Sequence, residues 1–148
     1  MKYFSIKELC QSGVAKKYGI DLIPNDWESE NLKSLIDNLL DPIRNIWEKP
    51  LYITNAFRPQ QLIDLMKKEG YKVSNTTQHK YGFCADFTTG NKSDNEKLFN
   101  VLAHRTDLKY DQLLDENSYS WIHIGEYKLA EYDNRESGKI QRNQILHI

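Results

Sequence analysis

Three residues, His79, Asp86 and His123, carry polar side chains in or beside stretches of otherwise apolar, strand-forming sequence. Two imidazoles and one carboxylate form a recognised zinc ligand set that leaves a fourth coordination position open. Four further residues of the same segments have side chains suited to chemistry: Arg58, Thr77, Cys84 and Glu116. The sequence has no glycine-rich phosphate loop, no G-x-S-x-G elbow and no H-E-x-x-H helix, which leaves this polar cluster as the candidate site.

The spacing of His79 and Asp86 restricts the chain between them. Their separation in sequence corresponds to ~10.5 Å along a helix and ~23 Å in a straight strand, too far for two ligands with bonds of about 2.1 Å to one metal. The chain must therefore turn between these residues. Gly82 is the residue that allows such a turn at low steric cost.

Hydrophobic periodicity predicts the elements that position the cluster. Apolar residues at helical spacing predict a core helix over residues 31–47, with a kink or break near Asp41 because Pro42 lacks an amide donor. Residues 51–57 are rich in β-branched and aromatic residues and predict a strand. Pro59 then begins a short helix that Gly70 ends.

The second half of the chain predicts mainly strands. Alternation over residues 83–88 predicts a strand with the phenylalanines on one face and Asp86 on the other. Ser93 and Glu96 have the spacing of a capping box, which predicts the start of another helix. A predicted hairpin and an edge strand follow, over residues 110–114, 121–124 and 139–148. Together these elements predict an α+β fold with a small, mainly antiparallel sheet and packed helices.

Composition predicts one domain spanning residues 1–148, in which hydrophobic residues make up 39% of the chain. Lys plus Arg (20) nearly balance Asp plus Glu (21), so we expect no nucleic-acid partner. We also expect the protein to be a monomer. The sequence has no apolar run of about 18 residues and no signal peptide, which predicts cytoplasmic synthesis without membrane insertion. Cys10 and Cys84 are expected to be free thiols, and His104 and His147 to be surface residues.

The pattern Thr77-x-His79-x-x-Gly82-x-x-x-Asp86, followed by Trp121-Ile122-His123-Ile124, resembles the signature of the M15 zinc peptidases. This family comprises D-alanyl-D-alanine carboxypeptidases and peptidoglycan endopeptidases, including small phage endolysin domains. Four further segments resemble its short members in the same order: Phe4 to Cys10, Leu40 to Arg44, Ile53 to Pro59, and Tyr110 to Leu113. The resemblance therefore covers nearly the whole chain.

The resemblance implies a DD-peptidase or hedgehog-like zinc peptidase fold and a zinc ion held by His79, Asp86 and His123. It implies hydrolysis of an amide bond in the stem or cross-link peptides of peptidoglycan, with Arg58 stabilising the developing oxyanion. The resemblance also implies a set of substrate-binding residues: Thr77, Gln112 and Trp121. From the residues alone, Thr77 is expected to orient its loop and Trp121 to pack in the core. Such an enzyme, made without a signal peptide, fits release through a phage-type membrane lesion.

One position departs from the family pattern. Many relatives carry the general base three residues before the second histidine, where this chain has Ser120, and serine is not an equivalent base at neutral pH. Glu116 is the replacement that we predict, if the two strands form a hairpin. Asp115 is the competing acid and points to the opposite face if the strand extends that far.

Three alternatives stay open at this point. Asp86 has the chemistry to pair with Arg58 in a structural salt bridge. A domain that kept the zinc and lost the base would bind peptidoglycan without cutting it. Cys84 with His79 or His123 as its base would make the protein a cysteine amidase, although a strand cysteine usually behaves as a small buried hydrophobe.

Overall fold

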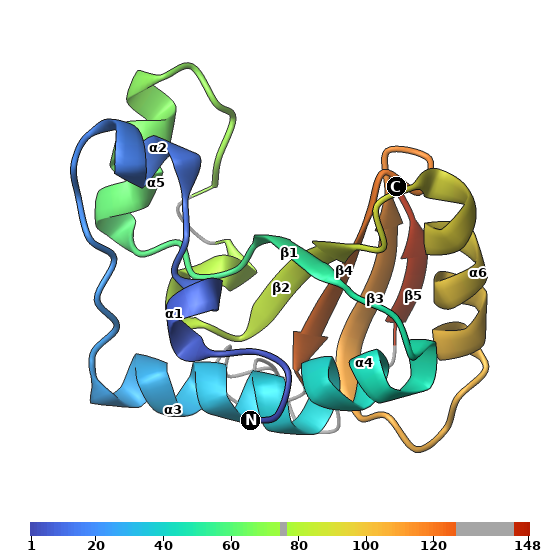
Figure 1. Ribbon diagram of the computed structural model, residues 1–148. Helices are drawn as coiled ribbons and strands as arrows, with labels where there is room; N and C mark the ends of the chain where they lie inside the picture. The colour runs from blue at the N-terminus through green and yellow to red at the C-terminus, as the bar shows by residue number, and fades with distance from the viewer. Residues whose placement is uncertain (75–76, 127–143) are drawn as a thin grey trace, which may run out of the picture.

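The computed structural model describes residues 1–74, 77–126 and 144–148. A sheet with the strand order β1-β2-β4-β3-β5 lies at the centre, and helices pack around it (Figure 1). Its strands are β1 (Tyr52–Asn55), β2 (Cys84–Thr88), β3 (Tyr110–Glu116), β4 (Trp121–Glu126) and β5 (Gln144–His147). The pairs β1–β2, β2–β4 and β3–β4 are antiparallel, whereas β5 runs parallel to β3. The predicted α+β class with a mainly antiparallel sheet is confirmed.

The predicted core helix is longer than expected and runs without a break. It comprises α3 (Asp26–Leu35), the π-helical segment η1 (Ile36–Leu40) and α4 (Asp41–Trp47). Of the predicted kink or break near Asp41, the break does not occur, but the helix is irregular there, because a wider π turn lies just before Pro42. There the amide of Asp41 donates to the carbonyl of Ile36, five residues back, and the backbone keeps right-handed helical angles.

Four further helices flank this arrangement: α1 (Ile6–Leu9), α2 (Gly13–Lys17), α5 (Gln60–Lys68) and α6 (Lys92–Ala103). The predicted cap of α6 is wrong by two residues. Asn91, not Ser93, is the N-cap, and its side chain accepts a hydrogen bond from the amide of Asp94. An asparagine at this position satisfies the same orphan amide that a serine would.

The two faces of the sheet differ in chemistry. Alternate strand residues join the hydrophobic core together with side chains of the long helix and of α6; on the strands these residues are Ala85, Phe87, Leu113, Ile122 and Ile124. The intervening residues point to the opposite face because side chains alternate along a strand. Asp86 and His123 belong to that second face, as the alternation predicts.

The C-terminal strand β5 is anchored to β3. The imidazole Nδ1 of His147 forms a hydrogen bond with the buried carboxylate of Asp115, and its ring lies 5.2 Å from that of Phe99 in α6. His147 is exposed, as predicted, although its imidazole contacts both Asp115 and Phe99. The predicted strand over residues 139–148 is observed from Gln144 onward, and residues 139–143 lie outside the described part of the chain. Within the described ranges, no helix combines the length and apolar character needed to cross a membrane.

Candidate metal and catalytic centre

The turn that carries His79 is a short 3-10 helix, η2 (Gln78–Tyr81). Thr77 caps it, since its hydroxyl oxygen accepts a hydrogen bond from the amide of His79 at 3.4 Å. Gly82 ends it with φ +85°, and a Cβ at this position would lie 2.9 Å from the Leu32 side chain. Both the left-handed backbone and the close approach of the core helix require glycine here. The predicted turn between His79 and Asp86 is confirmed.

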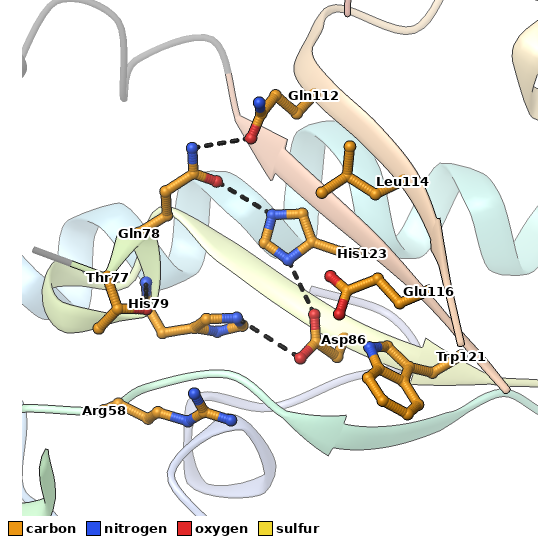
Figure 2. Close-up of a pocket in the computed structure, with 10 residues that line it drawn as sticks. All are labelled: Arg58, Thr77, Gln78, His79, Asp86, Gln112, Leu114, Glu116, Trp121 and His123. Atoms are coloured by element: carbon orange, nitrogen blue, oxygen red, sulfur yellow. Dashed lines mark hydrogen bonds and ion pairs between the residues drawn. The ribbon is translucent and has the colours of Figure 1, made fainter. Parts of the chain in front are cut away.

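Asp86 lies between the two imidazoles. It is directly opposite His123 in the antiparallel pairing of β2 with β4, so their side chains share one face of the sheet. Asp86 Oδ1 lies 2.8 Å from His123 Nδ1, and Asp86 Oδ2 lies 3.5 Å from His79 Nε2 (Figure 2). All three residues are buried. The turn at Gly82 and the pairing of β2 with β4 thus bring the three predicted ligands together.

Hydrogen bonds on the far side of each ring determine which nitrogen faces Asp86. The Nδ1–H of His79 donates to the carbonyl oxygen of Ala56 at 2.8 Å, and the Nε2–H of His123 donates to Gln78 Oε1 at 3.0 Å. A neutral imidazole holds one proton, so each ring then turns a lone pair toward the carboxylate. Lone pairs facing a carboxylate at these distances require a positive species between them, which is either a proton or a metal ion.

The charge of Asp86 suits a cation. Burial by itself raises the pKa of Asp86, but the attraction of His79 and the close contacts with both imidazoles outweigh it and hold this pKa well below its usual range. Asp86 is therefore a carboxylate. In a tetrahedral zinc site with bonds of 2.0–2.1 Å, neighbouring ligand atoms stand about 3.4 Å apart. The 3.5 Å between His79 Nε2 and Asp86 Oδ2 matches that separation, whereas the 2.8 Å between His123 Nδ1 and Asp86 Oδ1 is a hydrogen-bond distance.

Other donors surround the same point. Two sets of donor atoms among the described residues lie within 4.8 Å of one another, and they share His123. One set adds His79 and Cys84, and the other adds Asp86 and Glu116. The structure thus contains buried groups that could hold a metal ion, and the predicted ligands His79, Asp86 and His123 are distributed over both sets.

Glu116 and Asp115 point to opposite faces of β3. Glu116 lines the pocket beside Trp121 and His123, whereas Asp115 is on the α6 side, where it accepts from the amide of Tyr119 and pairs with His147. Burial raises the pKa of Glu116, and the nearby charge of Asp86 adds to the effect. Ser120 belongs to the β3–β4 turn and donates to the carbonyl of Asn117. Glu116 is therefore the acid placed at the candidate site.

Arg58 approaches from the end of β1. Its Nε donates to Asn55 Oδ1 at 2.7 Å, and the amide of Asn55 in turn donates to Asp86 Oδ2 at 3.2 Å. Burial lowers the pKa of Arg58 and the charge of Asp86 partly offsets this, but a guanidinium keeps its charge. Asn55 is a site residue that the sequence analysis missed. It separates Arg58 from Asp86, so no salt bridge is formed between them.

These side chains line one pocket of about 340 Å³. All eight residues predicted for the site contribute to it: Arg58, Thr77, His79, Asp86, Gln112, Glu116, Trp121 and His123. Gln78 and Leu114 complete the lining and were not predicted. The indole N–H of Trp121 is buried and faces Glu116 without meeting the geometry of a hydrogen bond (Figure 2). Trp121 is thus a half-buried pocket residue, and the expectation that it packs in the core is wrong.

Cys84 lies deeper than the pocket. It is fully buried, and burial followed by the charge of Asp86 raises the pKa of its thiol well above the usual value. A protonated thiol without solvent access is a poor nucleophile. Cys10 and Cys84 are both free thiols, as predicted.

Comparison of the chain with protein-family models and with curated proteins gives no match.

Proposed function

We propose that this protein is a zinc-dependent peptidase that hydrolyses an amide bond in peptidoglycan peptides. The observation that carries the proposal is the position of Asp86, a buried carboxylate whose two oxygens each face one imidazole nitrogen, at 3.5 Å and 2.8 Å. The substrate class rests on the resemblance of the residue pattern to the M15 peptidases, and the chemistry rests on the donor set.

His79, Asp86 and His123 would hold the zinc ion, and two neutral rings with one carboxylate are a ligand set typical of catalytic zinc sites. When bound, zinc supplies Lewis acidity, which lowers the pKa of a coordinated water and polarises a carbonyl group. The carbonyl of Ala56 and the amide of Gln78 hold the two rings in place.

Glu116 is the residue that we assign as general base. Its carboxylate belongs to the donor set that includes Asp86 and His123, so it lies beside the residues that would hold the zinc. The raised pKa of Glu116 brings this carboxyl closer to neutral pH, which makes it a stronger base than an ordinary glutamate. It would later pass the proton to the departing amine.

We assign to Arg58 the role of stabilising the negative charge that develops on the carbonyl oxygen of the substrate. Its guanidinium lines the pocket, and Asn55 holds it by the Nε donor, so its terminal nitrogens extend toward the pocket. Trp121 adds an apolar ring and a buried N–H donor for the peptide. Gln112 is a weaker candidate for substrate contact, because both atoms of its amide already bind other glutamines.

The substitution Glu116→Gln tests this assignment. Zinc-loaded protein is incubated with purified peptidoglycan, and the released peptides are identified by mass spectrometry, which also shows whether a terminal D-alanine or a cross-link is cut. We expect Glu116→Gln to bind zinc as the wild type does and to lose turnover by ~10²-fold or more. Glu96→Gln, the same change at an exposed position of α6, is the matched control. Unchanged turnover in Glu116→Gln would exclude Glu116 as the base.

The binding module is the second candidate, because Ser120 occupies the position at which many relatives carry the base. It predicts a wild-type protein that binds zinc and peptidoglycan peptides and releases no product. The cysteine amidase predicts loss of activity in Cys84→Ala with zinc still bound. Our proposal predicts that Cys84→Ala retains activity, since the thiol is buried and protonated.

A further inference from the structure

Three glutamine side chains connect His123 to the edge of the sheet. Gln78 Oε1 accepts from His123 Nε2 at 3.0 Å, and Gln78 Nε2 donates to Gln112 Oε1 at 2.8 Å (Figure 2). Gln112 Nε2 then donates to Gln144 Oε1 at 2.5 Å. The three residues belong to η2, β3 and β5, which are far apart in sequence. Their contacts with one another are therefore a product of the fold.

The three hydrogen bonds that link His123 to Gln144 all have the same direction. The donor is always on the side of His123 and the acceptor on the side of Gln144, so each amide presents its oxygen toward the site. Aligned amides polarise one another, which strengthens each link. The arrangement also fixes the orientation of Gln78, because its NH₂ group is held by Gln112. Only the oxygen of Gln78 then faces the ring of His123.

We propose that the chain Gln78–Gln112–Gln144 is a positioning device that keeps the proton of His123 on Nε2 and presents Nδ1 as its metal-binding atom. This inference rests on the metal centre of the proposed function. An acceptor behind a ligating imidazole orients the ring and increases its basicity, and loss of such a partner typically lowers metal affinity by ~10–100-fold. Gln78 has this position behind His123.

The two histidines differ in how their protons are fixed. His79 donates to a backbone carbonyl, that of Ala56, which no side-chain substitution removes. His123 depends on a side chain, which itself depends on two others. Substitution of a side chain can therefore remove the hydrogen-bond partner of His123 but not that of His79.

Strand β5 supports the far end of the chain. Gln144 is paired with Gln112 in the parallel register of β5 on β3, and three residues later His147 pairs with Asp115. The docking of β5 thus holds Gln144 where Gln112 can donate to it. The effect of each glutamine on zinc affinity should decrease with its distance along the chain from His123.

Zinc affinity measured by competition with a chromophoric chelator tests the proposal, with the metal alone as probe. We expect Gln78→Leu to weaken zinc binding by ~10–100-fold. Gln78→Glu keeps an acceptor for His123 and should recover most of that loss. Gln112→Leu and Gln144→Leu should weaken binding progressively less. Gln11→Leu, at an exposed glutamine of the N-terminal region, is the matched control and should leave affinity unchanged.

A spectroscopic measurement on the zinc-loaded wild type needs no variant. Long-range ¹H–¹⁵N correlation spectra should show the His123 proton on Nε2 and the signature of metal coordination at Nδ1. The opposite assignment overturns the proposal, and so does unchanged zinc affinity in a folded Gln78→Leu protein. If Gln78→Leu fails to fold, the zinc affinities of Gln78→Glu and Gln144→Leu and the wild-type spectrum test the proposal instead.

The outcomes separate this inference from the proposed function. Zinc binding that depends on Gln78, in a protein that cuts no peptide, supports the positioning device and refutes the peptidase. Peptide hydrolysis with zinc binding independent of Gln78 supports the peptidase and refutes the positioning device. A wild type that binds no zinc refutes both.

Discussion

Replacement of Gly82 by alanine tests the turn on which the site depends. The new Cβ would lie 2.9 Å and 3.1 Å from two atoms of the Leu32 side chain and 3.2 Å from the carbonyl oxygen of Glu28. Overpacking of this kind costs about 1–3 kcal/mol. The backbone has φ +85°, and the left-handed conformation costs an L-residue about 1–2 kcal/mol. We therefore expect Gly82→Ala to lower the free energy of unfolding by about 2–5 kcal/mol.

The matched control is Gly70→Ala. Gly70 also has a left-handed backbone, with φ +91°, but nothing lies within 4 Å of a Cβ built there. This variant should lose only the conformational part, about 1–2 kcal/mol. Urea unfolding followed by tryptophan fluorescence suits the comparison, because the ring of Trp27 lies 5.8 Å from that of Phe83, next to Gly82. Equal losses in the two variants would refute the close approach of the core helix to the turn.

Three further predictions concern stability. Asn95→Ala should lower the free energy of unfolding by about 1–3 kcal/mol, because the buried amide of Asn95 joins the amide of Thr89 to the carbonyl of Tyr119. Asn100→Ala, at an exposed site of α6, is the control. Equal unfolding midpoints of the two variants would refute this role. The pKa of Glu116 is raised in the folded state, so the native protein binds more protons than the unfolded chain and loses stability as pH rises through that range. Metal-free Glu116→Gln should consequently gain stability over the wild type at neutral pH and lose this advantage in acid, and a constant difference across pH would contradict the shift. Zinc at a hundred times its dissociation constant should raise the free energy of unfolding by about 2.7 kcal/mol, and a chelator should reverse the gain in a thermal melt.

Local patterns predicted most of the fold. The apolar stripe, the alternation around Asp86 and the hairpin before His123 each depend on residues close together in sequence, and each has its predicted type in the structure. The helices α1 and α2 were not predicted, and two errors concern sites at which two local signals compete. Pro42 predicts a kink or a break, yet the helix continues through a π turn just before it. Asn91 and Ser93 are both good caps, and the structure uses Asn91.

The sequence predicted most residues of the candidate site but not the hydrogen bonds that connect them. The turn at Gly82 follows from the distance between His79 and Asp86, and the strand pairing that puts Asp86 opposite His123 follows from the hairpin. Gln78 and Asn55 were missed because a neutral amide carries no charge or metal-ligand signal in a sequence. Their roles depend on partners more than twenty residues away, so only the fold reveals them.

Zinc stoichiometry tests the central claim most directly. The protein is prepared without chelators and its metal content is measured by native mass spectrometry, beside the isosteric variant Asp86→Asn. Our account predicts one zinc ion per wild-type chain and its loss in Asp86→Asn, because the carboxylate supplies the charge that both imidazoles face. A wild type that remains without zinc after the metal is added, or an Asp86→Asn variant that holds it equally well, would contradict the account.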